Sequence, residues 1–135
     1  MIYIKIILNI SQYNTKNQLG DIMSELTKEA LEVEGATVPF CTYTMGETQF
    51  IEFDTSKCGP PDPMVNAMAG LKLLDAPNKK VVMINHKSPG GLLAKIGENY
   101  DIAEEALEDG RVKLIFSYRE GESEQANLSD THCDG

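Results

Sequence analysis

The chain is poor in the residue types on which several classes of protein depend. Its 135 residues include no Trp, five Tyr and four Phe, and its 12 Lys and Arg are outnumbered by 21 Asp and Glu, which gives a net charge of -9. This shortage of cations argues against nucleic-acid binding, because few side chains could neutralise a run of phosphates. It also disfavours binding to anionic lipid. We take the acidic surface to serve solubility.

Long hydrophobic runs are absent as well. The opening M-I-Y-I-K-I-I-L-N-I is far shorter than the roughly 20 residues of a membrane span, and no A-x-A-like cleavage site follows it. We therefore expect no membrane span. Residues 1–22 are either an extra strand or a leader that is not made in the cell, since Gly20-Asp21 can be encoded by a ribosome-binding purine run ahead of Met23.

Cysteine is scarce and not closely spaced. Cys41, Cys58 and Cys133 are odd in number and form no C-x-x-C pair, which fits neither a secreted disulfide framework nor a zinc knuckle. We infer a reducing, cytoplasmic compartment. The chain also lacks G-x-x-x-x-G-K-[ST] and G-x-G-x-x-G. We therefore expect no cofactor and no metal site.

What is present is an alternation of strand-like and helix-like segments. Strands are predicted at 36–44, 48–54, 79–84 and 111–118. Helices are predicted at 63–74, with Asp62 as the cap, and after Ser88-Pro89, with an apolar stripe of Leu92, Leu93, Ile96 and Tyr100. Residues 101–107 favour a helix by propensity, but the turn signal Asp109-Gly110 predicts a strand pair there.

The two ends of the chain give weaker patterns. Residues 24–33 predict either a short amphipathic helix or a loose leader, within an N-terminal extension at 23–47. Residues 119–135 are polar and acidic, so we expect a disordered tail there.

One short motif points to a chemistry. The stretch S-K-C-G-P-P-D-P-M, residues 56–64, together with the element order around it, resembles the TusA/SirA-like family of small sulfur carriers, whose signature is C-P-x-P. Pro61-Asp62-Pro63 matches the P-x-P. Pro60 stands where the family has cysteine, and Cys58 lies two residues upstream of that position, behind Gly59. This displacement either places the thiol on a longer loop or removes the carrier function.

The resemblance covers residues 48–118 and implies a βαβαββ two-layer sandwich. With the strands ahead of it, the expected fold is α+β, a two-layer α/β sandwich with an extra N-terminal strand or hairpin. The resemblance also implies that Cys58 is catalytic and bears a persulfide, that Pro61 and Pro63 shape its loop, and that sulfur-donor and sulfur-acceptor proteins are the partners. Because the thiolate is the nucleophile, Lys57 and the helix N-terminus would favour it, whereas Asp62 would oppose it.

Two other functions stay open. His86 in I-N-H-K-S-P-G-G follows a strand and precedes a helix, where with Lys87 it could attract an anionic partner. A non-catalytic α/β module could bind a protein or small ligand through this 86–91 loop, and Cys58 would then be incidental. A thiol redox protein could instead use Cys58 with Cys133 as a relay thiol in the tail. We expect Cys41 to be a small core residue.

Overall fold

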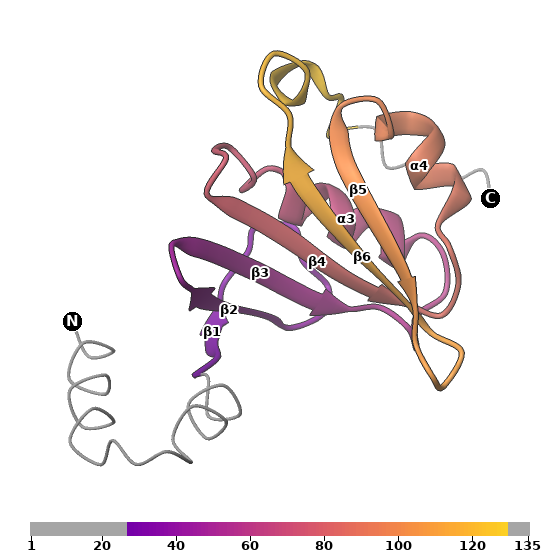
Figure 1. Cartoon of the computed structure of the whole chain (residues 1–135). Coiled ribbons are helices and arrows are strands. Elements are labelled where there is room, and N and C mark those ends of the chain that lie inside the picture. Colours follow the sequence, from indigo (N-terminus) through magenta and orange to yellow (C-terminus); the bar gives the residue numbers. More distant parts are fainter. Residues whose placement is uncertain (1–26, 130–135) are drawn as a thin grey trace, which may run out of the picture.

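Six strands form one open, mixed sheet in the computed structural model, which describes residues 27–129 (Figure 1). They are β1 (Glu29–Leu31), β2 (Phe40–Met45), β3 (Thr48–Asp54), β4 (Lys79–Asn85), β5 (Tyr100–Ala106) and β6 (Val112–Tyr118). Their order across the sheet is β1-β2-β3-β4-β6-β5. The neighbours β3 and β4 run parallel, whereas the other neighbouring pairs are antiparallel.

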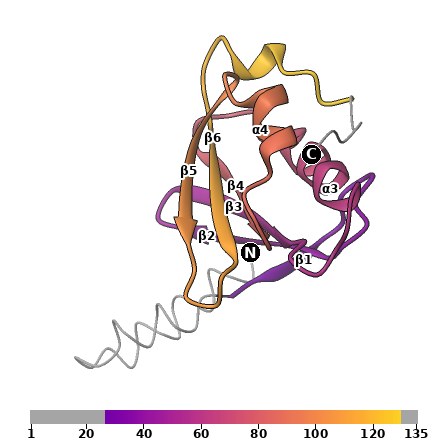
Figure 2. The same cartoon turned by 90° about the vertical axis from the view of Figure 1, so that its right-hand side faces the viewer.

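Both helices of the described part cover the same face of this sheet (Figure 2). Helix α3 (Asp62–Leu71) connects β3 to β4, and α4 (Gly90–Ile96) connects β4 to β5. Because β3 and β4 are parallel neighbours, the chain between them must cross over the sheet, and α3 forms this crossover. The fold is therefore α+β, in the predicted βαβαββ order with extra N-terminal strands. Within residues 27–129, no helix is both long and apolar enough to cross a membrane.

The core lies between the helices and the sheet. The register aligns Phe40, Phe53, Met83 and Leu114 in one row across four strands. All four side chains are buried, as are those of Met64, Ala67, Met68 and Leu71 on α3 and Leu92 and Ile96 on α4. At Gly70 a Cβ would lie 3.1 Å from the Phe40 ring. The bare glycine thus allows α3 to approach the sheet closely.

Several predicted boundaries differ from the structure near the N-terminal end. Residues 29–31 form a strand and not a helix, because they pair with β2. The strand predicted from residue 36 begins at Phe40. Residues 37 and 38 instead donate their backbone N–H groups to the side-chain oxygen of buried Asn66, at 2.8 and 3.3 Å.

The helix ends also differ from the prediction. Asp62 is the first residue of α3 and not a side-chain cap; Pro61 takes the cap position. The helix ends at Leu71 and not at residue 74. The Ser88 hydroxyl donates to Glu104 instead of capping α4, and Tyr100 lies in β5. Residues 101–106 are extended, so pairing with β6 overrides their helical propensity.

The segment after β6 is more ordered than predicted. A short 3-10 helix, η1 (Ser123–Gln125), follows the sheet, and Ala126 and Leu128 pack against the core. Ser123 is buried, accepts the N–H of Arg119 and donates to the carbonyl of Asn99. The prediction of a disordered tail is therefore wrong for residues 119–129. Residues 1–22, the Met23 start and Cys133 lie outside the described residues.

Candidate functional site

The carboxyl ends of β3 and β4 bring two distant sequence motifs to the same edge of the sheet. Because the strands are parallel neighbours, the loop with Cys58 after β3 lies beside the loop with His86 after β4. The Thr55 N–H donates to the carbonyl of Ile84 at 2.8 Å, which extends the pairing past the last residue of β3. Loops at such an edge are the usual place for a ligand in sheets of this type.

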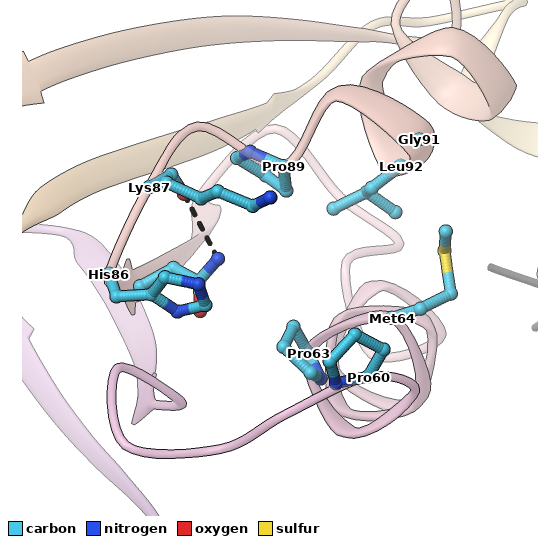
Figure 3. A pocket seen from close by; sticks show the side chains of 9 residues that line it. Pro60, Pro63, Met64, His86, Lys87, Pro89, Gly91 and Leu92 are labelled. Carbon is cyan, nitrogen blue, oxygen red and sulfur yellow. Dashed lines mark hydrogen bonds between the residues drawn. The ribbon is translucent and has the colours of Figure 1, made fainter. Parts of the chain in front are cut away.

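Two buried polar side chains tie the loops together. The Thr55 hydroxyl lies 3.0 Å from the side-chain oxygen of Asn85 and 3.2 Å from the carbonyl of Ile84. The Asn85 amide in turn donates to the carbonyl of Lys87 at 3.0 Å, shown dashed in Figure 3. Thr55 is 0% exposed and Asn85 is 2% exposed. Neither residue was predicted from the sequence, where the available signal was a polar residue at the end of each of two neighbouring strands.

A small cavity of about 90 Å³ opens between the two loops (Figure 3). Pro60, Pro63 and Met64 line it from the α3 side, and Asn85, His86, Lys87, Pro89, Gly91 and Leu92 line it from the β4–α4 side. The lining is mostly apolar, with Lys87 extending across it. An apolar lining with a few polar groups is a property of ligand pockets, but this cavity is smaller than the roughly 300–1,000 Å³ of pockets for drug-sized ligands.

The predicted site residues divide into two groups. Pro63 and His86 line the cavity, whereas Lys57, Cys58 and Pro61 lie in the adjoining turn and do not. Pro60, which stands where the sulfur-carrier signature has cysteine, is part of the cavity wall. Cys58 precedes Pro60 by two residues, which is at most about 7 Å of chain.

The turn that carries Cys58 is held by backbone bonds. The N–H of Cys58 donates to the carbonyl of Thr55 at 3.0 Å, and the N–H of Asp62 donates to the carbonyl of Gly59 at 3.1 Å. The Pro60–Pro61 peptide bond is cis. The Cys58 side chain is half-buried and not disulfide-bonded.

Three exposed basic side chains lie at this edge of an acidic molecule. Lys57, His86 and Lys87 are exposed, and none of them forms an ion pair with another residue of the range 27–129. The nearby carboxylate of Asp54 is already engaged by Arg111 at 3.0 Å and by the N–H of Ser56 at 2.8 Å. Asp62, in the first turn of α3, and Glu104, which accepts the Ser88 hydroxyl at 3.0 Å, remain as opposing negative charges.

The second thiol of the described part has a different environment. Cys41 was expected to be a core residue, but it is half-buried. Phe40 faces the helices, so the side chain of Cys41, the next residue, faces the opposite side of the sheet. Burial, and then the facing Glu52, raise the pKa of the Cys41 thiol, with Lys28 acting in the opposite direction. Cys41 is therefore biased toward the unreactive thiol form.

The same carboxylate also affects Tyr43 on this helix-free face. The Tyr43 hydroxyl donates to Glu52 at 2.9 Å, and the ring stacks on Phe50 with centroids 5.2 Å apart. Burial and this hydrogen bond raise the pKa of Tyr43 above its ordinary value. The phenol thus remains a neutral donor.

In residues 27–129, no group of three or more His, Cys, Asp or Glu side chains is placed to hold a metal ion.

Comparison with known proteins found no relative. No protein-family model matches the chain, and no significant match was found among curated proteins or solved structures.

Proposed function

We propose that this protein carries sulfur as a persulfide on Cys58, receiving it from a donor protein and passing it to an acceptor protein. The observation that carries the proposal is the position of a half-buried thiol in a turn at the entrance of α3, next to exposed Lys57. The partial P-x-P signature at Pro61-Asp62-Pro63 supports it. A reducing, cytoplasmic setting would keep this thiol free.

The chemistry consists of two thiol exchanges. The Cys58 thiolate attacks the outer sulfur of the donor persulfide, the donor S–S bond breaks, and the donor leaves as a thiolate. The new Cys58 persulfide is then attacked at its outer sulfur by an acceptor thiolate, which releases the Cys58 thiolate. Each exchange transfers one sulfane sulfur atom, so no external oxidant or reductant is required.

Peptide mapping after exposure to sodium polysulfide tests the proposal. We expect one added sulfur atom on the Cys58 peptide, removable by dithiothreitol, absent in Cys58→Ser and retained in Cys41→Ser and Cys133→Ser. Label on Cys41 alone, or on no thiol, would overturn the proposal. Rapid formation of a Cys58–Cys133 disulfide would instead support the redox alternative.

A second variant tests whether the thiol must stand at Pro60, the position where the sulfur-carrier signature has cysteine. Pro60→Cys combined with Cys58→Ser moves the thiol from the turn to the cavity wall. If the extra residues only lengthen the loop, both positions should accept sulfur. If the variant accepts sulfur and the natural chain does not, the displacement has removed the carrier function.

The cavity favours a second candidate, a small binding module. Five of its nine lining residues, namely His86, Lys87, Pro89, Gly91 and Leu92, belong to the 86–91 loop or the residue that follows it. Binding there would not require Cys58, so a Cys58→Ser variant that binds its ligand normally would favour this second function.

A further inference from the structure

We propose that the cavity binds a small carboxylic acid with a short apolar body, the apolar part lying between the proline rings and the carboxylate lying near Lys87. This inference rests on the second candidate function and not on sulfur transfer. It follows from four properties of the site: its walls, its size, its rigidity and its charge.

The walls of the cavity suit a hydrocarbon group. Pro60 and Pro63 face Pro89 and Leu92 across it, and Met64 lies at the end of the α3 wall (Figure 3). Met64 and Leu92 are only 3% and 1% exposed, so they form a fixed apolar base. Transfer of a ligand's methylene groups onto such a surface is favourable, because it removes apolar area from water.

The size limits the ligand to a small molecule. A volume of about 90 Å³ corresponds to about three water molecules, since each occupies roughly 30 Å³ in the liquid. An aromatic ring, which an apolar cavity of about 150 Å³ can enclose, is too large to be enclosed here. A short hydrocarbon chain can place part of its length in the cavity, with its polar end extending through the opening. Larger cofactors such as nucleotides would extend well beyond it.

The cavity is also formed before a ligand arrives. Proline fixes its own backbone angle, and three of the lining residues are prolines. A hydrogen bond joins the side chains of Thr55 and Asn85, and the Asn85 amide donates a second one to the Lys87 carbonyl. These hydrogen bonds fix the loop after β3 relative to the loop after β4. A preformed site avoids much of the entropic cost of ordering loops on binding.

Charge at the rim selects an anion. Lys87 lines the cavity together with His86, and Lys57 lies on the adjoining turn; none of them forms an ion pair within residues 27–129. The nearby acids differ in how far they are engaged. Asp54 is paired with Arg111, whereas Asp62 and Glu104 keep their negative charges, because the Ser88 hydroxyl that Glu104 accepts is neutral. Neither of these two acids lines the cavity, whereas Lys87 does, so the carboxylate of a ligand is placed near Lys87.

Nuclear magnetic resonance titration of the full chain with a matched series of ligands tests this inference. The series is sodium hexanoate, 1-hexanol and hexylammonium chloride, which share a chain and differ in charge. We expect hexanoate to bind with a millimolar Kd, as is usual for so small a ligand, and to shift the amides of Met64, His86, Lys87 and Leu92. The alcohol should bind about tenfold more weakly and the ammonium more weakly still.

Two lysine variants separate the site from general surface charge. Lys87→Gln should weaken hexanoate binding about fivefold, in the range of an exposed charge pair. It should weaken binding of 1-hexanol much less, because the alcohol has no charge to lose contact with. Lys72→Gln, at the exposed end of α3, should leave both unchanged. The inference is overturned if hexanoate causes no shifts at the cavity, if the three ligands bind alike, or if both lysine variants weaken binding equally.

Cys58→Ser distinguishes this inference from the sulfur-carrier proposal. The variant should bind hexanoate as the natural chain does, because Cys58 is not part of the lining. Loss of hexanoate binding in Cys58→Ser would contradict the inference. Failure of hexanoate to bind the natural chain would leave the polysulfide result on Cys58 unaffected, so the two proposals fail separately.

Discussion

The two thiols of the described part sit in regions that are stabilised in different ways. Cys41 is in the middle of a strand pair, where β2 and β3 exchange backbone hydrogen bonds. Cys58 is in a loop, and the edge of the sheet that carries this loop is held by the buried side chains of Thr55 and Asn85. Both thiols are half-buried, so exposure alone does not distinguish their reactivity.

Their neighbours distinguish them instead. Cys41 faces Glu52, and burial together with this carboxylate raises its thiol pKa. Cys58 follows Lys57 and lies in a turn formed by backbone bonds. The comparison indicates that partial burial, with an acidic cross-strand neighbour as the second cause, biases the Cys41 thiol toward its protonated form. It also makes Cys58 the thiol of the described part to test for sulfur chemistry.

The largest effect is expected from removing the side-chain tie near Cys58. Asn85→Ala deletes the amide that supports the Lys87 carbonyl and leaves the buried Thr55 hydroxyl with one partner fewer. We expect the free energy of unfolding to fall by about 2 kcal/mol, measured by urea unfolding followed by circular dichroism.

A matched change in the strand pair provides the control. Thr42→Val removes a hydroxyl that donates to the carbonyl of Phe50 at 2.9 Å on a half-exposed strand. The backbone ladder of β2 and β3 remains, so the loss should stay below about 1 kcal/mol. Equal losses in the two variants would contradict the proposed difference between the regions.

The second prediction concerns the thiols directly. In the folded protein at neutral pH, iodoacetamide should label Cys58 roughly tenfold faster than Cys41, because only the thiolate reacts. Unfolding in concentrated urea removes both environments, and the two rates should then become similar. Quantitative peptide mapping at short times measures the ratio. Similar rates in the folded protein would show that Glu52 and burial do not protect Cys41.

The physical origin of the two environments explains how much the sequence could reveal. Short runs of β-branched and aromatic residues predicted β3, β4 and β6, and the Asp62-Pro63 start predicted α3, because these signals are local. The bond between Thr55 and Asn85 joins residues 30 apart in the chain. It becomes visible only once β3 and β4 are known to be parallel neighbours.

Other misses have the same cause. The residues of β1, E-A-L, have helical propensity, and only their pairing with β2 makes them a strand. The position of Ser123 depends on contacts with the distant residues Asn99 and Arg119. The face of Cys41 was available from the sequence, because strand alternation places it opposite to a buried Phe40. The cavity required both loops together.

A third prediction tests the acidic neighbour of Cys41. Glu52→Gln removes the negative charge that raises the Cys41 pKa but retains an acceptor for the Tyr43 hydroxyl. We expect the labelling rate of Cys41 at neutral pH to rise about threefold, since more of the thiol is ionised. The labelling rate of Cys58, on another part of the sheet, should not change. A rise in both rates would indicate general loosening of the fold instead.

The smallest effect should come from the cation beside the same pair, and it has the opposite sign. The Lys28 amine lies 3.3 Å from Glu52 and 5.0 Å from the centre of the Tyr43 ring, and it lowers the Cys41 pKa. Lys28→Gln should therefore slow labelling of Cys41, by less than about twofold because the amine is exposed and screened by salt. Competitive labelling with light and heavy iodoacetamide resolves a change of this size. The effect should grow as ionic strength falls, and faster labelling would show that Lys28 acts mainly through packing against the Tyr43 ring.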